Sequence, residues 1–172
     1  VQTCALPISN PCPCGFFGSE STECTCTAQE IARYRRRMSG PILDRIDLQL
    51  NMQEVKYDDL KSDKRGKNIV LDSKTMSSMV SDAIKFSKTE GRDEKCGNIS
   101  DKSIRDACLL GSLENEFIES AYDRLNLSPR SYIRTLKVAR TIADVEQERK
   151  VSVVHLAEAL GYRCGEFDKG KV

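Results

Sequence analysis

The chain has 172 residues, of which 39% are hydrophobic and 31% are charged, and its formal net charge is +1. This length accommodates one domain, or two small ones, with a real hydrophobic core. The near-neutral charge excludes a protein that binds polyanions by bulk charge, so any nucleic-acid contact must come from a local cluster such as residues 33–37. No apolar run is long enough to span a membrane and no signal-peptide pattern is present, so we expect a cytoplasmic protein with no membrane partner.

The first residues of the chain look foreign to a natural protein. The chain begins with Val1 rather than Met, and residues 1–8 resemble the translation of a common sequencing-library adaptor. We therefore expect residues 1–9 to be an adaptor-derived or disordered tail, with the protein itself starting near Ser9 or Asn10 and its upstream part missing. The alternative is a natural N-terminal tail.

Four of the eight cysteines lie close together in a loop that contains several prolines and glycines. Cys12, Cys14, Cys24 and Cys26 form two C-x-C pairs separated by nine residues. Four thiolates in one short loop would close a tetrahedral Zn²⁺ site, although the spacing differs from the usual C-x₂₋₄-C knuckle. The alternatives are reduced thiols packed without metal and labile disulfides, whereas a redox centre is disfavoured because the spacing is not C-x-x-C. We predict a structural metal site in a reducing compartment.

A basic helix is predicted to follow the cysteine loop. Thr27 and Glu30 form a capping box that opens the helix, and Gly40 ends it. Apolar residues at helical spacing form one stripe, while four arginines between residues 33 and 37 occupy the other faces. The pattern leaves open whether this basic surface is solvated or contacts a neighbouring subunit or nucleic acid.

Arg45 stands at the junction between a helix-breaking Gly-Pro pair and a predicted strand. Apolar and polar residues alternate over residues 46–52, which predicts a half-buried strand. An arginine at the end of a rigid element is well placed to reach an anion. The alternative is an exposed ion pair with Asp44 or Asp47.

The remainder of the chain is predicted to be helical. After a polar and charged linker at residues 54–72, capping and breaking residues predict helices over about 73–88, 100–110, 112–125, 128–146 and 152–160. Ser128 and Pro129 are a strong helix start, with serine as the cap and proline in the first turn. Arg130, Arg134 and Lys137 share one face of that helix. This face is either a phosphate-facing stripe near the helix N-terminus or a solvated basic surface.

Together, these stretches resemble the C-terminal half of the YifB/ComM-type magnesium-chelatase-like AAA+ ATPases. The resemblance is carried by residues 10–15, 24–26, 39–47, 128–134 and 137–144, and residues 159–163 resemble the family's end. It covers about residues 10–163 and is weakest between 54 and 112. The order and spacing of several motifs make the resemblance far more specific than any single motif.

The resemblance implies an α+β fragment that is mostly α. Residues 10–53 would be the end of an AAA+ α/β core, with a short strand and a cysteine knob. Residues 54–72 would be a linker, residues 73–165 an all-α lid domain, and residues 166–172 a polar tail.

The resemblance also implies roles for individual residues. Asn10 matches the sensor-1 residue that orients the attacking water, and Arg45 matches the arginine finger that enters the neighbouring subunit's ATP site. Arg130 matches sensor 2, which touches the γ-phosphate, and Arg134 on the same helix is a further candidate nucleotide contact. The implied cofactors of the intact protein are ATP and Mg²⁺, the implied assembly is a homo-hexamer, and DNA processing or branch migration in competence implies a DNA partner.

The sequence departs from the family pattern in two important ways. It contains no G-x-x-x-x-G-K-[ST] motif and no apolar strand ending in paired acidic residues before Asn10. We therefore expect this chain alone neither to bind ATP well nor to hydrolyse it. The alternative function is a stand-alone nucleic-acid-binding module stabilised by zinc.

Overall fold

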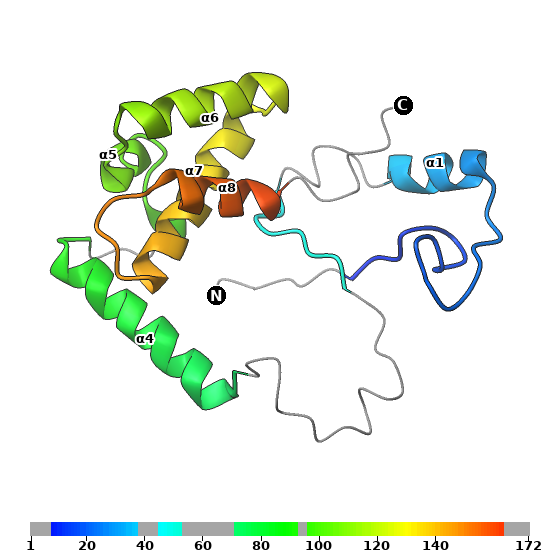
Figure 1. Cartoon of the computed structure of the whole chain (residues 1–172), viewed down its shortest axis with the longest axis horizontal. Helices are drawn as coiled ribbons and strands as arrows, with labels where there is room; N and C mark the ends of the chain where they lie inside the picture. The colour runs from blue at the N-terminus through cyan, green and yellow to red at the C-terminus, as the bar shows by residue number, and fades with distance from the viewer. Residues whose placement is uncertain (1–7, 38–44, 53–70, 93–95, 164–172) are drawn as a thin grey trace. The chain divides into compact units, whose positions relative to one another are not determined.

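The computed structural model describes residues 8–37, 45–52, 71–92 and 96–163. Contacts divide the chain into two units, Val1–Ile46 and Asp47–Val172. The described residues are mostly helical and contain no β-strand (Figure 1). The mostly α character expected from the sequence is therefore confirmed for this part of the chain. The predicted tails at residues 1–9 and 166–172 lie largely or wholly outside the described residues.

The first unit consists of a loop at residues 8–27 followed by helix α1 (Ala28–Arg37). The predicted capping box is confirmed. The Thr27 backbone N–H donates to Glu30 Oε2 at 2.8 Å, and the Glu30 backbone N–H donates to Thr27 Oγ1 at 3.3 Å. No residue of α1 is fully buried, but the Arg35 guanidinium lies 4.9 Å from the Phe17 ring centroid and connects the helix to the loop.

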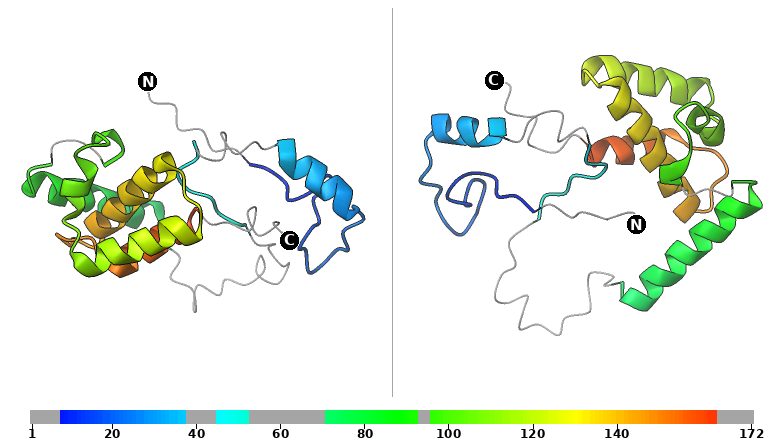
Figure 2. Two further views of the ribbon diagram at one scale, coloured as in Figure 1. Left: turned by 90° about the horizontal axis from the view of Figure 1, so that it is seen from above. Right: turned by 180° about the vertical axis from the view of Figure 1, so that it is seen from behind.

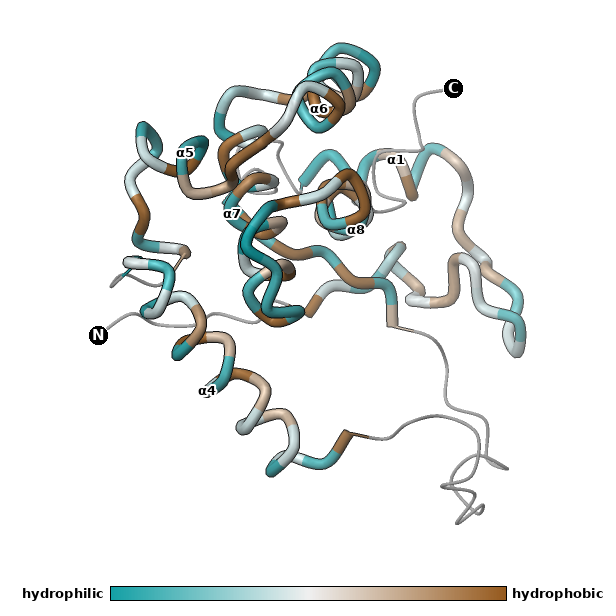
Figure 3. The backbone as a smooth tube through the Cα atoms, turned by 60° about the vertical axis from the view of Figure 1, so that its left-hand side comes forward, coloured by the Kyte–Doolittle hydropathy of each residue, from teal (hydrophilic) through white to brown (hydrophobic). Residues whose placement is uncertain are grey.

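The second unit is a bundle of helices arranged around α7. Its elements are α4 (Ser73–Thr89), η1 (Cys96–Asn98), α5 (Ile104–Cys108), α6 (Ser112–Arg124), α7 (Pro129–Val145) and α8 (Val153–Gly161). Helix α7 packs against α4, η1, α5 and α8, so it touches most of the unit (Figure 2). The core residues come from all of these elements except α4, and Figure 3 shows hydrophobic segments where α7 and α8 lie together.

Helix α7 begins as the sequence predicts. The Ser131 backbone N–H donates to Ser128 Oγ at 3.1 Å, and Pro129 is the first helical residue. Ala139 and Ala143 lie fully buried on the inward face, where their small side chains allow neighbouring elements to approach closely. The pattern of the sequence therefore specifies both the start of this helix and its packed face.

A buried charge network lies on the same inward face of α7. Arg140 is fully buried and its Nη2 lies 3.0 Å from Asp144 Oδ1, one helical turn away. Arg92 Nη2 approaches the same Asp144 oxygen at 2.5 Å. Arg140 also donates to the carbonyl oxygens of Glu148 and of Arg149, the latter at 2.8 Å. The network therefore joins α7 to the segment that leads to α8 and to the segment that follows α4.

The strand predicted over residues 46–52 is wrong. These residues have no regular secondary structure, and Leu48, Leu50 and Met52 are 50%, 66% and 90% exposed. A strand requires a neighbouring strand to pair its backbone groups, and the described residues offer none. Instead, the Gln49 backbone N–H donates to the Tyr162 carbonyl at 2.7 Å, at the end of α8.

Several helix boundaries also differ from the prediction. Helix α5 begins at Ile104, after Ser103, rather than at about residue 100. Asp72, rather than Ser73, caps α4, since its Oδ1 accepts from the Thr75 backbone N–H at 2.7 Å. Helix α5 ends at Leu109, which takes the left-handed conformation with φ 51°. Gly111, expected to end this helix, is the residue that precedes α6. Each boundary depends on which of several adjacent candidates forms the hydrogen bond.

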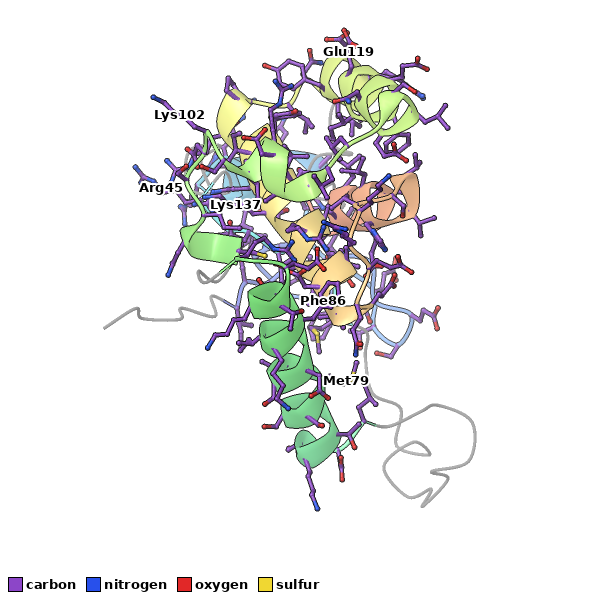
Figure 4. All side chains as sticks on the ribbon, turned by 90° about the vertical axis from the view of Figure 1, so that its left-hand side faces the viewer. Arg45, Met79, Phe86, Lys102, Glu119 and Lys137 are labelled. Carbon is purple, nitrogen blue, oxygen red and sulfur yellow. The ribbon has the colours of Figure 1, made fainter. Side chains whose placement is uncertain are left out.

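Helix α4 exposes much of its apolar side. Met76, Met79, Val80 and Ile84, whose helical spacing puts them on one side of α4, are 39–57% exposed. Phe86 lies toward the end of α4 that approaches α7, and Met79 lies nearer the N-terminal end of the helix (Figure 4). Only the C-terminal part of α4 is therefore integrated with the bundle.

Replacing Arg140 with alanine is expected to lower the free energy of unfolding by about 3–5 kcal/mol, because buried Asp144 keeps only Arg92 as a charged partner and the carbonyls of Glu148 and Arg149 lose their donor. Urea denaturation followed by circular dichroism measures this loss. Arg149→Ala is the matched control, since it removes a pair with Glu90 whose arginine side chain is 74% exposed. We expect that control to cost less than about 1 kcal/mol. Equal losses in the two variants would contradict a structural role for the network.

Candidate functional site

The four clustered cysteines come together in the first unit. The sulfur atoms of Cys12, Cys14, Cys24 and Cys26 all lie within 4.8 Å of one another. Cys12 Sγ is 3.3 Å from Cys14 Sγ and 3.7 Å from Cys24 Sγ, and Cys14 Sγ is 3.5 Å from Cys24 Sγ. All four are free thiols, so the disulfide alternative is not what the structure contains.

Tight turns in the loop create this cluster. Gly15 has φ 88°, a conformation that favours glycine, and its N–H donates to the Cys12 carbonyl at 3.1 Å. The Phe17 backbone N–H then donates to Cys12 Sγ at 3.3 Å. Cys12 is fully buried, while the other three cysteines are partly exposed. These turns thus position Cys12 and Cys14, and Cys24 and Cys26 complete the cluster.

The spacing and chemistry of the cluster fit a tetrahedral metal ion. Thiolates bound about 2.3 Å from Zn²⁺ in a tetrahedron have their sulfur atoms about 3.8 Å apart, close to the separations observed here. The Phe16 backbone N–H lowers the pKa of Cys14 to about 6. A backbone hydrogen bond with Cys14 lowers the pKa of Cys26, but burial and the neighbouring thiols outweigh it and raise the pKa to about 12. Cys14 is therefore deprotonated more readily than an ordinary cysteine, and the thiolate is the form that binds metal.

A second candidate site is a groove beside α7. Arg130, Arg134 and Lys137 line it together, as their spacing on one helix face predicts. The groove has a volume of about 1110 Å³ and is closed on other sides by Asp47 and Tyr162, among other residues. The structure thus brings the predicted basic stripe into one concave surface.

The three cations of the groove are not equivalent. Arg134 forms an ion pair with Asp47, and its side chain is 21% exposed. Lys137 Nζ lies 3.1 Å from Asp101 Oδ1. Arg130 is exposed and makes no ion pair with any residue that the structure describes. Arg130 is therefore the cation whose charge is least compensated by the protein.

Asn10 and Arg45 both belong to the first unit and are exposed. The Asn10 side chain lies beside the turn at Gly15, where a Cβ would come 3.7 Å from Asn10 Nδ2. Arg45 follows directly on residues 38–44, which lie outside the described residues and hold most of its motif. Their proposed roles stay predictions.

Sequence reasoning missed several charged residues of the helical unit. It placed no charge on the inward side of α7, where Arg140 and Asp144 lie, although their four-residue spacing, each directly after a buried alanine, was a usable signal. It also did not pair Asp47 with Arg134, because no local pattern connects residues so distant in the chain.

Burial raises the pKa of Cys96 to about 11 and that of Cys108 to about 12, which agrees with structural thiols in the core.

No helix in the described part of the chain is long and apolar enough to cross a membrane.

The chain matches two family models. Residues 71–163 match the model described as magnesium chelatase, subunit ChlI C-terminal, and residues 2–60 match the model described as magnesium chelatase, subunit ChlI. The second match includes most of the segment expected to derive from an adaptor.

Curated relatives match over nearly the whole chain. Competence protein ComM of Haemophilus influenzae is 36% identical over 159 residues, which are 90% of this chain and 29% of that protein. The uncharacterized protein YifB of Escherichia coli is 34% identical, over 90% of this chain and 29% of its own length. The uncharacterized protein Rv2897c of Mycobacterium tuberculosis is 26% identical, over 90% of this chain and 30% of its own. The chain thus spans less than a third of the length of these relatives.

Proposed function

This chain belongs to the magnesium chelatase ChlI family, and from that premise we propose that it is the C-terminal part of a magnesium-chelatase-like AAA+ ATPase. Family membership confirms the resemblance inferred from the motifs. In the proposal, the intact protein binds ATP with Mg²⁺ and hydrolyses it as a homo-hexameric ring. In the same proposal the protein acts in DNA processing or branch migration in competence, and the similarity to a protein named competence protein ComM supports the link to competence.

The observation that carries the proposal is the basic groove beside α7. Arg130 lies in the first turn of α7, where the helix dipole also favours an anion. Phosphoryl transfer is catalysed mainly by positioning and by cations placed against developing negative charge. Arg130 is thus suited to touch the γ-phosphate of a nucleotide as sensor 2, and Arg134 lies one turn further along the same helix face.

The first unit would supply two further catalytic groups. Arg45 is exposed, as a side chain that enters a neighbouring subunit's ATP site must be. Asn10 carries a short amide that can orient the attacking water. ATP supplies the phosphoryl group and Mg²⁺ neutralises its charge when both are bound. The chain has no P-loop of its own, so tight nucleotide binding requires residues beyond those in this sequence, whereas the groove can contact a phosphate through Arg130 and Arg134.

The cysteine cluster would hold a structural Zn²⁺ through Cys12, Cys14, Cys24 and Cys26. Its sulfur separations support this assignment. The first unit buries few apolar side chains, so metal binding would contribute much of its folding free energy.

One observation also favours a nucleic-acid contact on the first unit, which the alternative of a zinc-stabilised binding module requires. Phe16 and Phe17 are each 43% exposed, and Arg35 stacks on Phe17 beside the other arginines of α1. Aromatic rings and arginines together suit single-stranded nucleic acid. Binding that weakens steeply with added salt would support this contact over a subunit interface.

Replacing Arg45 with alanine in the intact ATPase is expected to lower ATP turnover by about a thousandfold or more while leaving nucleotide binding unchanged, because a finger acts on the transition state in a neighbouring site. Steady-state phosphate release and equilibrium nucleotide binding measure the two effects. Arg33→Ala, on the exposed surface of α1, is the matched control and should retain turnover. Normal turnover in the Arg45 variant would remove it from the finger role.

Replacing Arg130 with alanine in the intact ATPase is expected to reduce ATP turnover by about tenfold to a hundredfold, since hydrogen bonds to a charged phosphate are worth about 1.5–3 kcal/mol. The same phosphate-release measurement tests it. Arg124→Ala is the control, because Arg124 is exposed at the end of α6 and does not line the groove. An unaffected rate would favour the alternative of a solvated basic face.

Elemental analysis of the purified chain is expected to find about one Zn²⁺ per molecule. Cys12→Ser should lower the zinc content, whereas Cys108→Ala, which changes a thiol in the helical core, should not. A chelator should speed amide exchange over residues 10–37 and leave the helical unit protected. A metal-free chain with residues 10–37 fully protected would contradict the metal site.

A further inference from the structure

The segment that follows Arg45 is held on the groove by an ion pair between two residues of this chain. The Asp47 carboxylate pairs with the guanidinium of Arg134. Arg134 is 21% exposed and lines the groove, whereas Asp47 is 63% exposed. The acidic partner is therefore easily released into water, while the basic partner stays in the groove.

A second attachment lies two residues further along. The Gln49 backbone N–H donates to the Tyr162 carbonyl at 2.7 Å, at the end of α8. Leu48, between the two attachments, lines the same groove as Arg134. Residues 47–49 thus lie along the groove and contact both α7 and α8, in place of the strand that the sequence predicted.

We propose that Asp47 is an anion-displaceable latch, which holds residues 47–49 on the groove until a nucleotide phosphate takes Arg134. This inference rests on the proposed function, in which the groove receives that phosphate. A carboxylate and a phosphate compete for the same bidentate donors of a guanidinium, and the phosphate carries the larger charge. Because Asp47 is mostly exposed, its pair with Arg134 is weak enough to be displaced.

The latch links the groove to the proposed finger through the covalent chain. Arg45 is two residues from Asp47, so their Cα atoms are never more than about 7 Å apart. Attachment of Asp47 therefore limits the positions that Arg45 can reach, and release removes that limit. Asp47 is in this sense a positioning residue: it acts through Arg45 and touches no substrate. The nucleotide held by one subunit would in this way control the finger that the subunit offers to its neighbour.

The hydrogen-exchange rate of the Gln49 amide in the 172-residue chain tests the latch, because this N–H donates the hydrogen bond that lies two residues from Asp47. Asp47→Asn and Arg134→Gln should each speed its exchange about twofold to fivefold, and the double variant should be no faster than either single variant. Asp101→Asn is the matched control: it breaks the neighbouring pair with Lys137, which lies outside residues 47–49, and should leave the rate unchanged. Unchanged exchange in the Asp47 and Arg134 variants would overturn the latch.

Inorganic tripolyphosphate tests displacement, with sodium chloride at matched ionic strength as the control for screening. Tripolyphosphate should shift the side-chain resonances of Arg130 and Arg134 and bring Gln49 exchange in the unaltered chain to the rate of Asp47→Asn. The Asp47→Asn chain should bind it without a further change in exchange. Binding without faster Gln49 exchange would overturn the latch alone, and no binding would overturn both the latch and the phosphate role of the groove. Normal turnover in the Arg45→Ala ATPase would remove the finger role and leave the latch standing.

Discussion

The helical unit depends on one buried interaction, the charge network of Arg140 and Asp144 on the inner face of α7. A charge taken out of water is tolerated only if it is paired and hydrogen-bonded, so each buried charge of the network needs specific partners in a suitable geometry. Asp144 accepts from Arg140 and Arg92, while Arg140 also donates to backbone carbonyls before α8. The apolar core around α7 supplies the burial, and the network specifies which segments meet there.

The orientation of the groove follows from this constraint. Because Arg140 must point inward, the rotation of α7 about its axis is set, and the face that carries Arg130, Arg134 and Lys137 comes to line one surface. Two of these cations are then compensated by acidic residues brought from elsewhere in the unit. The core of the unit and the charge distribution of the groove are therefore two consequences of one helix orientation.

The two units are stabilised in different ways. The helical unit buries apolar side chains around α7, whereas Cys12 is the only fully buried hydrophobic residue among those described in the first unit. Its order comes from turns, the capping of α1 and the convergence of four sulfur atoms. A segment with so small a core is the kind that a structural metal stabilises. This contrast explains how the cysteine loop can be ordered with so small an apolar core of its own.

The sequence by itself determined the features that depend on neighbouring residues. The cap at Ser128, the capping box at Thr27 and the clustering of four cysteines each involve groups within a few turns or one loop, so local chemistry decides them. The family was also recoverable, because several motifs stand in a characteristic order. Only the tertiary structure decided that Arg140 is buried and that residues 46–52 are not a strand. The physical reason is the same in both cases: a buried charge and a strand each require partners from distant parts of the chain, and a local pattern cannot specify those partners.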